Sequence, residues 1–139
     1  MINYKLFIAP VGRILLANIF LIDGIKKIPA YENVAEWMFF KGVPEFLLPW
    51  AIAFEIAGSL AIIVGWRTKL FSLLFFSFCV LTAAIFHSDF TSSMDQIIFM
   101  KNLSMAGGFL FLFLHGGGDY SFDNHRKKNQ NLSHPKVGL

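Results

Sequence analysis

Long apolar runs separated by short polar segments dominate the chain. Four runs, at residues 6–24, 46–65, 70–86 and 97–114, are each close to the ~20 residues that a helix needs to cross the hydrocarbon core of a bilayer. A backbone inside a bilayer has no water to bond, so each run is expected to be helical. The pattern predicts an all-α integral membrane protein, an antiparallel bundle of four transmembrane helices.

The connections between these runs differ in character. Within residues 25–45, Val34, Trp37, Met38 and Lys41 recur at helical spacing, which favours a short amphipathic helix at the membrane interface. The alternative is an irregular loop with scattered aromatic side chains. The tight turn at residues 65–69 makes the second and third helices antiparallel neighbours. The glycines at 116–118 end the fourth helix, so we expect a transmembrane domain at residues 1–123 and a basic, disordered tail at residues 124–139.

Composition supports the membrane prediction. Hydrophobic residues make up 55% of the 139 residues and charged residues only 15%, more apolar content than a soluble core of this size can hold. The net charge is +3, and most of the charged residues lie beside the apolar runs or in the tail. This distribution is explained by membrane orientation, so no nucleic-acid partner is expected. The single cysteine, Cys79, excludes dithiol chemistry within the chain. No zinc-ligand spacing appears, so no metal is expected.

The distribution of Lys and Arg predicts the orientation. The side with both termini and the 65–69 turn holds seven of these residues, and the other side holds three. Both termini are therefore expected in the cytoplasm. The seven are Lys5, Arg67, Lys69, Arg126, Lys127, Lys128 and Lys136, and the three are Lys26, Lys27 and Lys41.

Two ionisable residues interrupt the apolar runs. Arg13 lies about 12 Å along the first helix from Lys5, and Glu55 lies about 15 Å along the second from Gly65, at ~1.5 Å per residue. Similar depth and opposite charge predict a buried Arg13–Glu55 ion pair that fixes the bundle. The alternative gives Glu55 a functional role as a proton carrier.

A second polar group collects at the outer ends of the helices. It contains a carboxylate, two ammonium groups, an imidazole and an amide, which together can bind an anion or a quinone carbonyl. The alternative is that these side chains sit at the interface and reach water. The candidate ligand-binding residues are Asp23, Lys27, His87, Lys101 and Asn102.

Taken in order, these elements resemble the DoxX family of small bacterial membrane proteins. The resemblance covers residues 13–123, and its specificity comes from the order and spacing of several short elements. These are Arg13, residues 20–27, residues 55–58, residues 65–68, His87, residues 101–108 and residues 116–123.

The resemblance implies a four-helix protein of the bacterial inner (plasma) membrane. Founding members of the family are linked to quinone-dependent thiosulfate oxidation, and others to oxidative-stress complexes. The leading hypothesis is therefore a quinone-interacting membrane subunit of a redox complex, with quinone as the cofactor and a redox protein as the partner. The alternatives are a non-enzymatic assembly or scaffold partner and a small proton-coupled transporter. The sequence leaves open whether the chain is an enzyme and whether it forms homo-oligomers.

Overall fold

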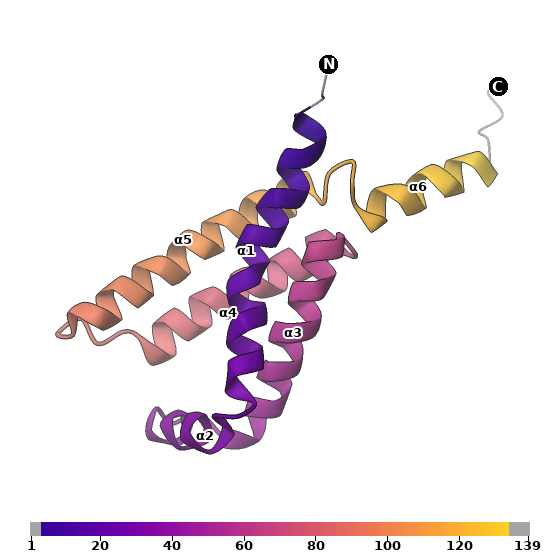
Figure 1. Ribbon diagram of the computed structural model, residues 1–139. Helices are drawn as coiled ribbons and strands as arrows, with labels where there is room; N and C mark the ends of the chain where they lie inside the picture. Colours follow the sequence, from indigo (N-terminus) through magenta and orange to yellow (C-terminus); the bar gives the residue numbers. More distant parts are fainter. Residues whose placement is uncertain (1–3, 134–139) are drawn as a thin grey trace.

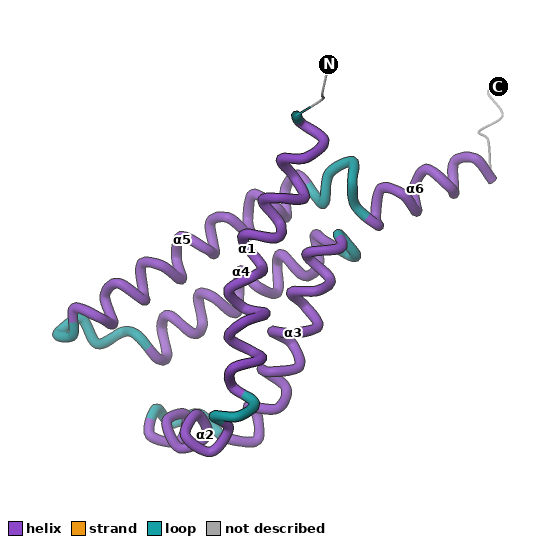
Figure 2. The backbone as a smooth tube through the Cα atoms, in the orientation of Figure 1, coloured by secondary structure: helices purple, strands orange, loops and turns teal. Residues whose placement is uncertain are grey.

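The structure is a computed structural model that describes residues 4–133. Within this range all regular structure is helical and no strand occurs, which confirms the predicted all-α class. Figures 1 and 2 show the path of the chain. The helices are α1 (Lys5–Lys27), α2 (Tyr31–Phe40), the short 3-10 turn η1 (Glu45–Leu47), α3 (Leu48–Val64), α4 (Thr68–Phe86), α5 (Ser93–His115) and α6 (Phe122–Ser133).

Four segments are long and apolar enough to cross a membrane. They span Leu6–Lys27, Glu45–Val64, Thr68–Phe86 and Ser93–His115. Large apolar side chains cover their outer surfaces, as at Leu15 and Trp50, which are 72% and 73% exposed. Such surfaces suit lipid, where an apolar exterior carries no penalty. The predicted four transmembrane helices are confirmed.

The four spanning helices form two closely packed pairs. Helix α1 packs along α3, and α4 packs along α5. Figure 1 shows the second pair inclined to the first. Where the pairs meet, the rings of Phe20, Phe75 and Phe109 form a buried cluster, with the last two stacked at 5.0 Å. Gly58 makes this contact possible, because a Cβ atom there would lie 2.9 Å from the Phe75 ring.

Local signals account for the helix ends. Gly65 adopts a left-handed conformation (φ +76°) and ends α3, a conformation that glycine adopts without steric cost. The Ser92 hydroxyl accepts a hydrogen bond from the Asp95 N–H and caps the start of α5. Gly116 ends α5, as the glycine triplet predicts.

Helix α2 occupies the long first connection, so this segment is helical and not an irregular loop. Ala35 and Met38 of α2 are buried against Leu48 of α3. The location of α2 at a membrane surface stays a prediction, as does the antiparallel order of the whole bundle across a bilayer.

The tail differs from the prediction of disorder. Residues 122–133 form α6, which crosses the predicted domain boundary between residues 123 and 124. The start of this helix is held in place, because the Ser121 hydroxyl accepts the Asn124 N–H at 3.2 Å and Asp123 bonds to the start of α4. A prediction based only on polar composition cannot detect these hydrogen bonds. Residues 134–139 of the predicted tail lie outside the described residues.

Candidate functional site

A cavity of about 620 Å³ is lined by side chains from α1 to α5. The structure brings all five residues of the predicted ligand-binding group to its wall, together with Glu55. They come from the end of α1, the end of α4 and the first turns of α5, and the chain between α1 and α3 contributes a further wall. The five are Asp23, Lys27, His87, Lys101 and Asn102. That they bind a ligand stays a prediction.

Lys27 is the central charged group of this cavity. Its ammonium donates to Glu55 Oε1 at 2.5 Å and to Asp23 Oδ2 at 2.8 Å. The Glu55 side chain is 1% exposed, whereas the Asp23 side chain is 58% exposed. Lys27 therefore bridges a buried carboxylate and a carboxylate that reaches the surface.

Glu55 keeps part of its hydrogen-bonding capacity unused. Its Oε2 atom is buried and has no hydrogen-bond partner among the described residues. Gly24 makes room for this carboxylate, because a Cβ on Gly24 would lie 3.0 Å from Glu55 Cβ and 3.4 Å from Oε2. An unsatisfied buried acceptor is costly, so a donor from water or a ligand would be stabilised here.

The predicted Arg13–Glu55 ion pair is wrong. Glu55 pairs with Lys27, and Arg13 donates from Nη2 to the Tyr120 carbonyl at 2.6 Å. Arg13 lies close to Gly65, where α3 ends, while Glu55 lies beside Gly24 near the end of α1. The first turns of α1 extend beyond the end of α3 (Figure 1). Counting depth from Lys5 therefore placed Arg13 too far along the bundle.

Arg13 instead links the first half of α1 to the connection between α5 and α6. The residue is 3% exposed, and its Nη1 atom lies near the backbone of Gly65 and Gly117. Its Nε and Nη1 atoms have no hydrogen-bond partner among the described residues. That Arg13 fixes the bundle stays a prediction; its hydrogen bond goes to Tyr120 in the α5–α6 connection.

His87 is oriented by a partner that sequence reasoning missed. Its Nδ1 atom lies 3.0 Å from Asp95 Oδ1, across the connection between α4 and α5. The Trp37 ring lies 5.9 Å from the imidazole and stacks on Phe86 at 4.7 Å. The spacing Ser92-x-x-Asp95 is typical of a helix start. This pattern could have shown that Asp95 lies in the first turn of α5. With Nδ1 engaged, Nε2 is the ring nitrogen left for a ligand.

Lys101 and Asn102 belong to the wall that α5 contributes to the cavity. Asn102 is 8% exposed, and its side-chain amide donates to the Ile98 carbonyl at 3.2 Å. Lys101 is exposed and lines the same cavity. An amide nitrogen carries two N–H groups and an ammonium three, so each residue keeps a donor for a ligand.

The remaining walls are mostly apolar and aromatic. Sequence reasoning noticed Trp37 and Met38 of α2 only as part of an amphipathic pattern, yet both line the cavity. An apolar chamber with a few convergent polar groups is the usual form of a small-molecule site. Among the described residues, no group of three or more His, Cys, Asp or Glu side chains is suited to a metal ion. Other apolar wall residues are Phe20, Leu48, Phe78, Phe86 and Met105.

Comparison with known proteins agrees with this membrane architecture. The DoxX family model matches residues 8–88. Inner membrane protein YqjF of Escherichia coli (strain K12) is 42% identical over 113 residues, covering 81% of this chain and 87% of the relative. Inner membrane protein YphA of the same organism is 32% identical over 120 residues, covering 81% of this chain and 86% of the relative. No solved structure matches the chain significantly. With its four apolar spans, the chain is a multi-pass inner-membrane protein that belongs to the DoxX family.

Proposed function

We propose that the cavity at Lys27 and Glu55 binds the head group of a quinone, and that the protein is a quinone-interacting membrane subunit of a redox complex. One observation carries the proposal. Cationic, amide and imidazole groups from three helices share a single, largely apolar cavity within the spanning bundle. A quinone needs both properties, because its ring is apolar and its two carbonyl oxygens accept hydrogen bonds.

The polar groups are suited to the two carbonyls. Lys101 and Asn102 lie next to each other on α5, whereas His87 lies at the end of α4. One carbonyl accepts from Lys101 or Asn102. The Nδ1–H of His87 faces the Asp95 carboxylate, so His87 donates to the other carbonyl from Nε2 only as an imidazolium, with both ring nitrogens protonated. Charge-assisted donors of this kind are the stronger ones.

The aromatic groups are suited to the ring. Trp37 and Phe86, stacked at 4.7 Å, present flat surfaces at the wall, and offset stacking with a quinone ring is favourable. The apolar tail of a quinone then extends past Phe78 and Leu81 into lipid.

Fluorescence of Trp37 provides a direct binding test. The chain has three tryptophans, and only Trp37 lines this cavity. A Trp50→Phe/Trp66→Phe variant in mild detergent, titrated with a short-chain ubiquinone analogue, should show saturable quenching. Adding Lys101→Met and His87→Gln should raise Kd about tenfold or more, the loss expected for one charge-assisted hydrogen bond.

Lys41→Met supplies the matched control. Lys41 is an exposed lysine outside the cavity wall, so its loss should leave Kd unchanged. Absence of saturable quenching in the parent, or equal Kd values in both variants, would refute quinone binding.

The redox partner needs a separate experiment. Full-length protein extracted in mild detergent should copurify with a redox enzyme, and a chain recovered alone would count against the complex. A defined partner without quinone binding would favour the alternative of an assembly protein. Proton uptake driven by substrate in vesicles would favour the transporter, with Glu55 as the carrier.

A further inference from the structure

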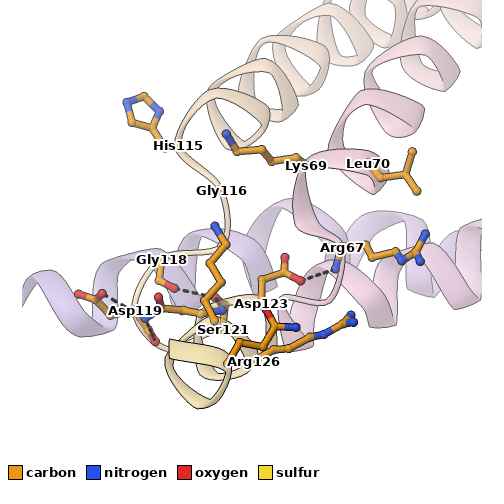
Figure 3. Close-up of a pocket in the computed structure, with 14 residues that line it drawn as sticks. Arg67, Lys69, Leu70, His115, Gly116, Gly118, Asp119, Ser121, Asp123 and Arg126 are labelled. Carbon is orange, nitrogen blue, oxygen red and sulfur yellow. Dashed lines mark hydrogen bonds between the residues drawn. The ribbon is translucent and has the colours of Figure 1, made fainter. Parts of the chain in front are cut away.

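We propose that a second cavity, at the opposite end of the bundle, binds the phosphate group of an anionic phospholipid. This cavity has a volume of about 790 Å³ and lies between the α3–α4 turn, the end of α5 and the start of α6 (Figure 3). Its wall residues include Arg67, Lys69, His115, Arg126 and Lys127.

The cavity sits where the apolar spans stop. The span of α4 begins at Thr68 and that of α5 ends at His115, and the wall contains residues on the polar side of both limits. Lipid phosphates occupy this level, just outside the hydrocarbon. Trp66, which is 40% exposed, is an aromatic residue of the type enriched at this boundary.

The charges of the cavity favour an anion. Among the described residues, Lys69, Arg126 and Lys127 take part in no salt bridge. Figure 3 shows the side chains of Arg67 and Arg126 extending to the same side of the cavity. Basic side chains next to a spanning helix attract anionic lipid by about 1 kcal/mol each.

The acidic wall residues are already engaged. Asp123 accepts the backbone N–H groups of Arg67 and Thr68, both at 2.8 Å. The Asp119 carboxylate accepts the Asn124 side-chain amide at 3.4 Å. Lys127 interacts electrostatically with Asp123. Four cationic side chains nevertheless outnumber the two carboxylates in the wall, so the cavity keeps a net positive charge.

An apolar wall residue distinguishes a lipid from a free anion. Leu70 lines the cavity and is 45% exposed. On the same helix Leu73 and Leu74 are also exposed, at 41% and 43%. An acyl chain attached to the bound phosphate would continue along this apolar surface of α4, whereas inorganic phosphate would leave it uncovered.

Lipid titration of the full-length protein tests the proposal. In neutral detergent, native mass spectrometry would count bound phosphatidylglycerol, with phosphatidylcholine as the zwitterionic comparison that carries a phosphate but no net charge. Lys69→Gln/Arg126→Gln removes two exposed cationic groups of the cavity. It should weaken phosphatidylglycerol binding about 30-fold, at ~1 kcal/mol for each charge.

Lys26→Gln/Lys41→Gln is the charge-matched control, because both lysines are exposed and belong to the other end of the bundle. It should change phosphatidylglycerol binding less than about threefold, against the loss of about 30-fold expected for the two cavity charges. Equal loss in the two variants would overturn the proposal, since the effect would then follow net charge alone. Equal binding of the two lipids would overturn it as well. Displacement of the lipid by an equal concentration of inorganic phosphate would show that the site takes the free anion, which would overturn the assignment to lipid.

Discussion

The ammonium of Lys27 lies 2.5 Å from Glu55 Oε1, and Oε2 of the same carboxylate has no partner among the described residues. The pair joins the end of α1 to the middle of α3. Because Lys27 also contacts Asp23 at 2.8 Å, the two partners are not equivalent. Removing the lysine leaves a buried carboxylate alone, whereas removing the glutamate leaves the lysine with Asp23.

Lys27→Met should therefore destabilise the protein more than Glu55→Gln. We expect a loss of about 3–5 kcal/mol for Lys27→Met, the cost of an unpaired buried charge, and about 1 kcal/mol for Glu55→Gln. The double variant should lose less than the sum of the two. Unfolding in detergent measures all four proteins, and strict additivity would argue against the pair.

Gly24→Ala should disturb the contact between α1 and α3. The added Cβ would lie 3.0 Å from Glu55 Cβ and 3.0 Å from Ile56 Cγ1, so we expect a loss of about 1–3 kcal/mol from overpacking. Gly12→Ala on the same helix is the control, because no atom lies within 4 Å of its added Cβ. Its unfolding temperature should stay the same or rise, since alanine favours a helix interior.

Gly65→Ala should destabilise the protein more than Gly42→Ala. Both glycines have positive φ, at +76° and +75°, so both variants carry the same backbone strain of about 1–2 kcal/mol. Only at Gly65 would the new Cβ meet Arg13 Nη1 and Ser121 Cβ, and the space at Gly42 is open. Thermal unfolding should show an additional loss of about 1–3 kcal/mol for Gly65→Ala. Equal losses of stability in the two variants would mean that Arg13 and Ser121 move away from the new Cβ atom without an energetic cost.

Asp123→Asn should remove a pH-dependent contribution to stability. Partial burial raises the pKa of Asp123, but hydrogen bonds from the backbone N–H groups of Thr68 and Arg67 outweigh it, so the pKa is lowered overall. A lowered folded-state pKa gives stabilisation that is fully present above the ordinary value of about 3.9 and is lost as pH falls through the folded-state value.

Unfolding measured at pH 7 and near pH 3 tests the direction of this pH dependence of stability. At pH 7 the variant should lose about 1 kcal/mol, as for a lost helix cap, and the difference from the parent should shrink at low pH. Asp119→Asn is the control, because the Asp119 carboxylate contacts the Asn124 side chain and no backbone N–H of α4. A difference that stays constant with pH would contradict the assignment.

Both termini are predicted to lie in the cytoplasm. Cys79 is 0% exposed, so it provides a silent background for cysteine labelling. With a membrane-impermeant maleimide on intact spheroplasts, Thr91→Cys in the α4–α5 connection should react. Lys128→Cys on α6 should react only after the membrane is opened. The reverse pattern would invert the topology.

Sequence reasoning identified both members of the buried ion pair but assigned the wrong partners. Periodicity and length locate a residue along its own helix, so Glu55 and Arg13 were recognised as charges inside the apolar runs and Lys27 as a polar group at a helix end. Pairing depends on how far each helix extends past its neighbours. This offset is set by contacts such as Arg13 with Tyr120, 107 residues away, which no local pattern records.

The outer polar group shows the opposite case. Asp23, Lys27, His87, Lys101 and Asn102 could be grouped because each lies at or near the outer end of a predicted span, and successive crossings in alternating directions bring these ends to the same side of a membrane. The aromatic wall from Trp37 could not be assigned, since its place follows from packing of α2 against Leu48. The helical state of residues 124–133 escaped for the same reason, because tertiary anchoring at Asp123 overrides polar composition.

The hydrogen bond between Arg13 and the Tyr120 carbonyl also bears on how the protein is made. At ~5–20 residues per second, synthesis of the intervening 107 residues takes about 5–20 s. During that interval the first helix leaves the ribosome with a guanidinium that lacks its acceptor. Final closure of the bundle therefore waits for nearly the whole polypeptide, and a chain truncated before Tyr120 would leave Arg13 without this acceptor.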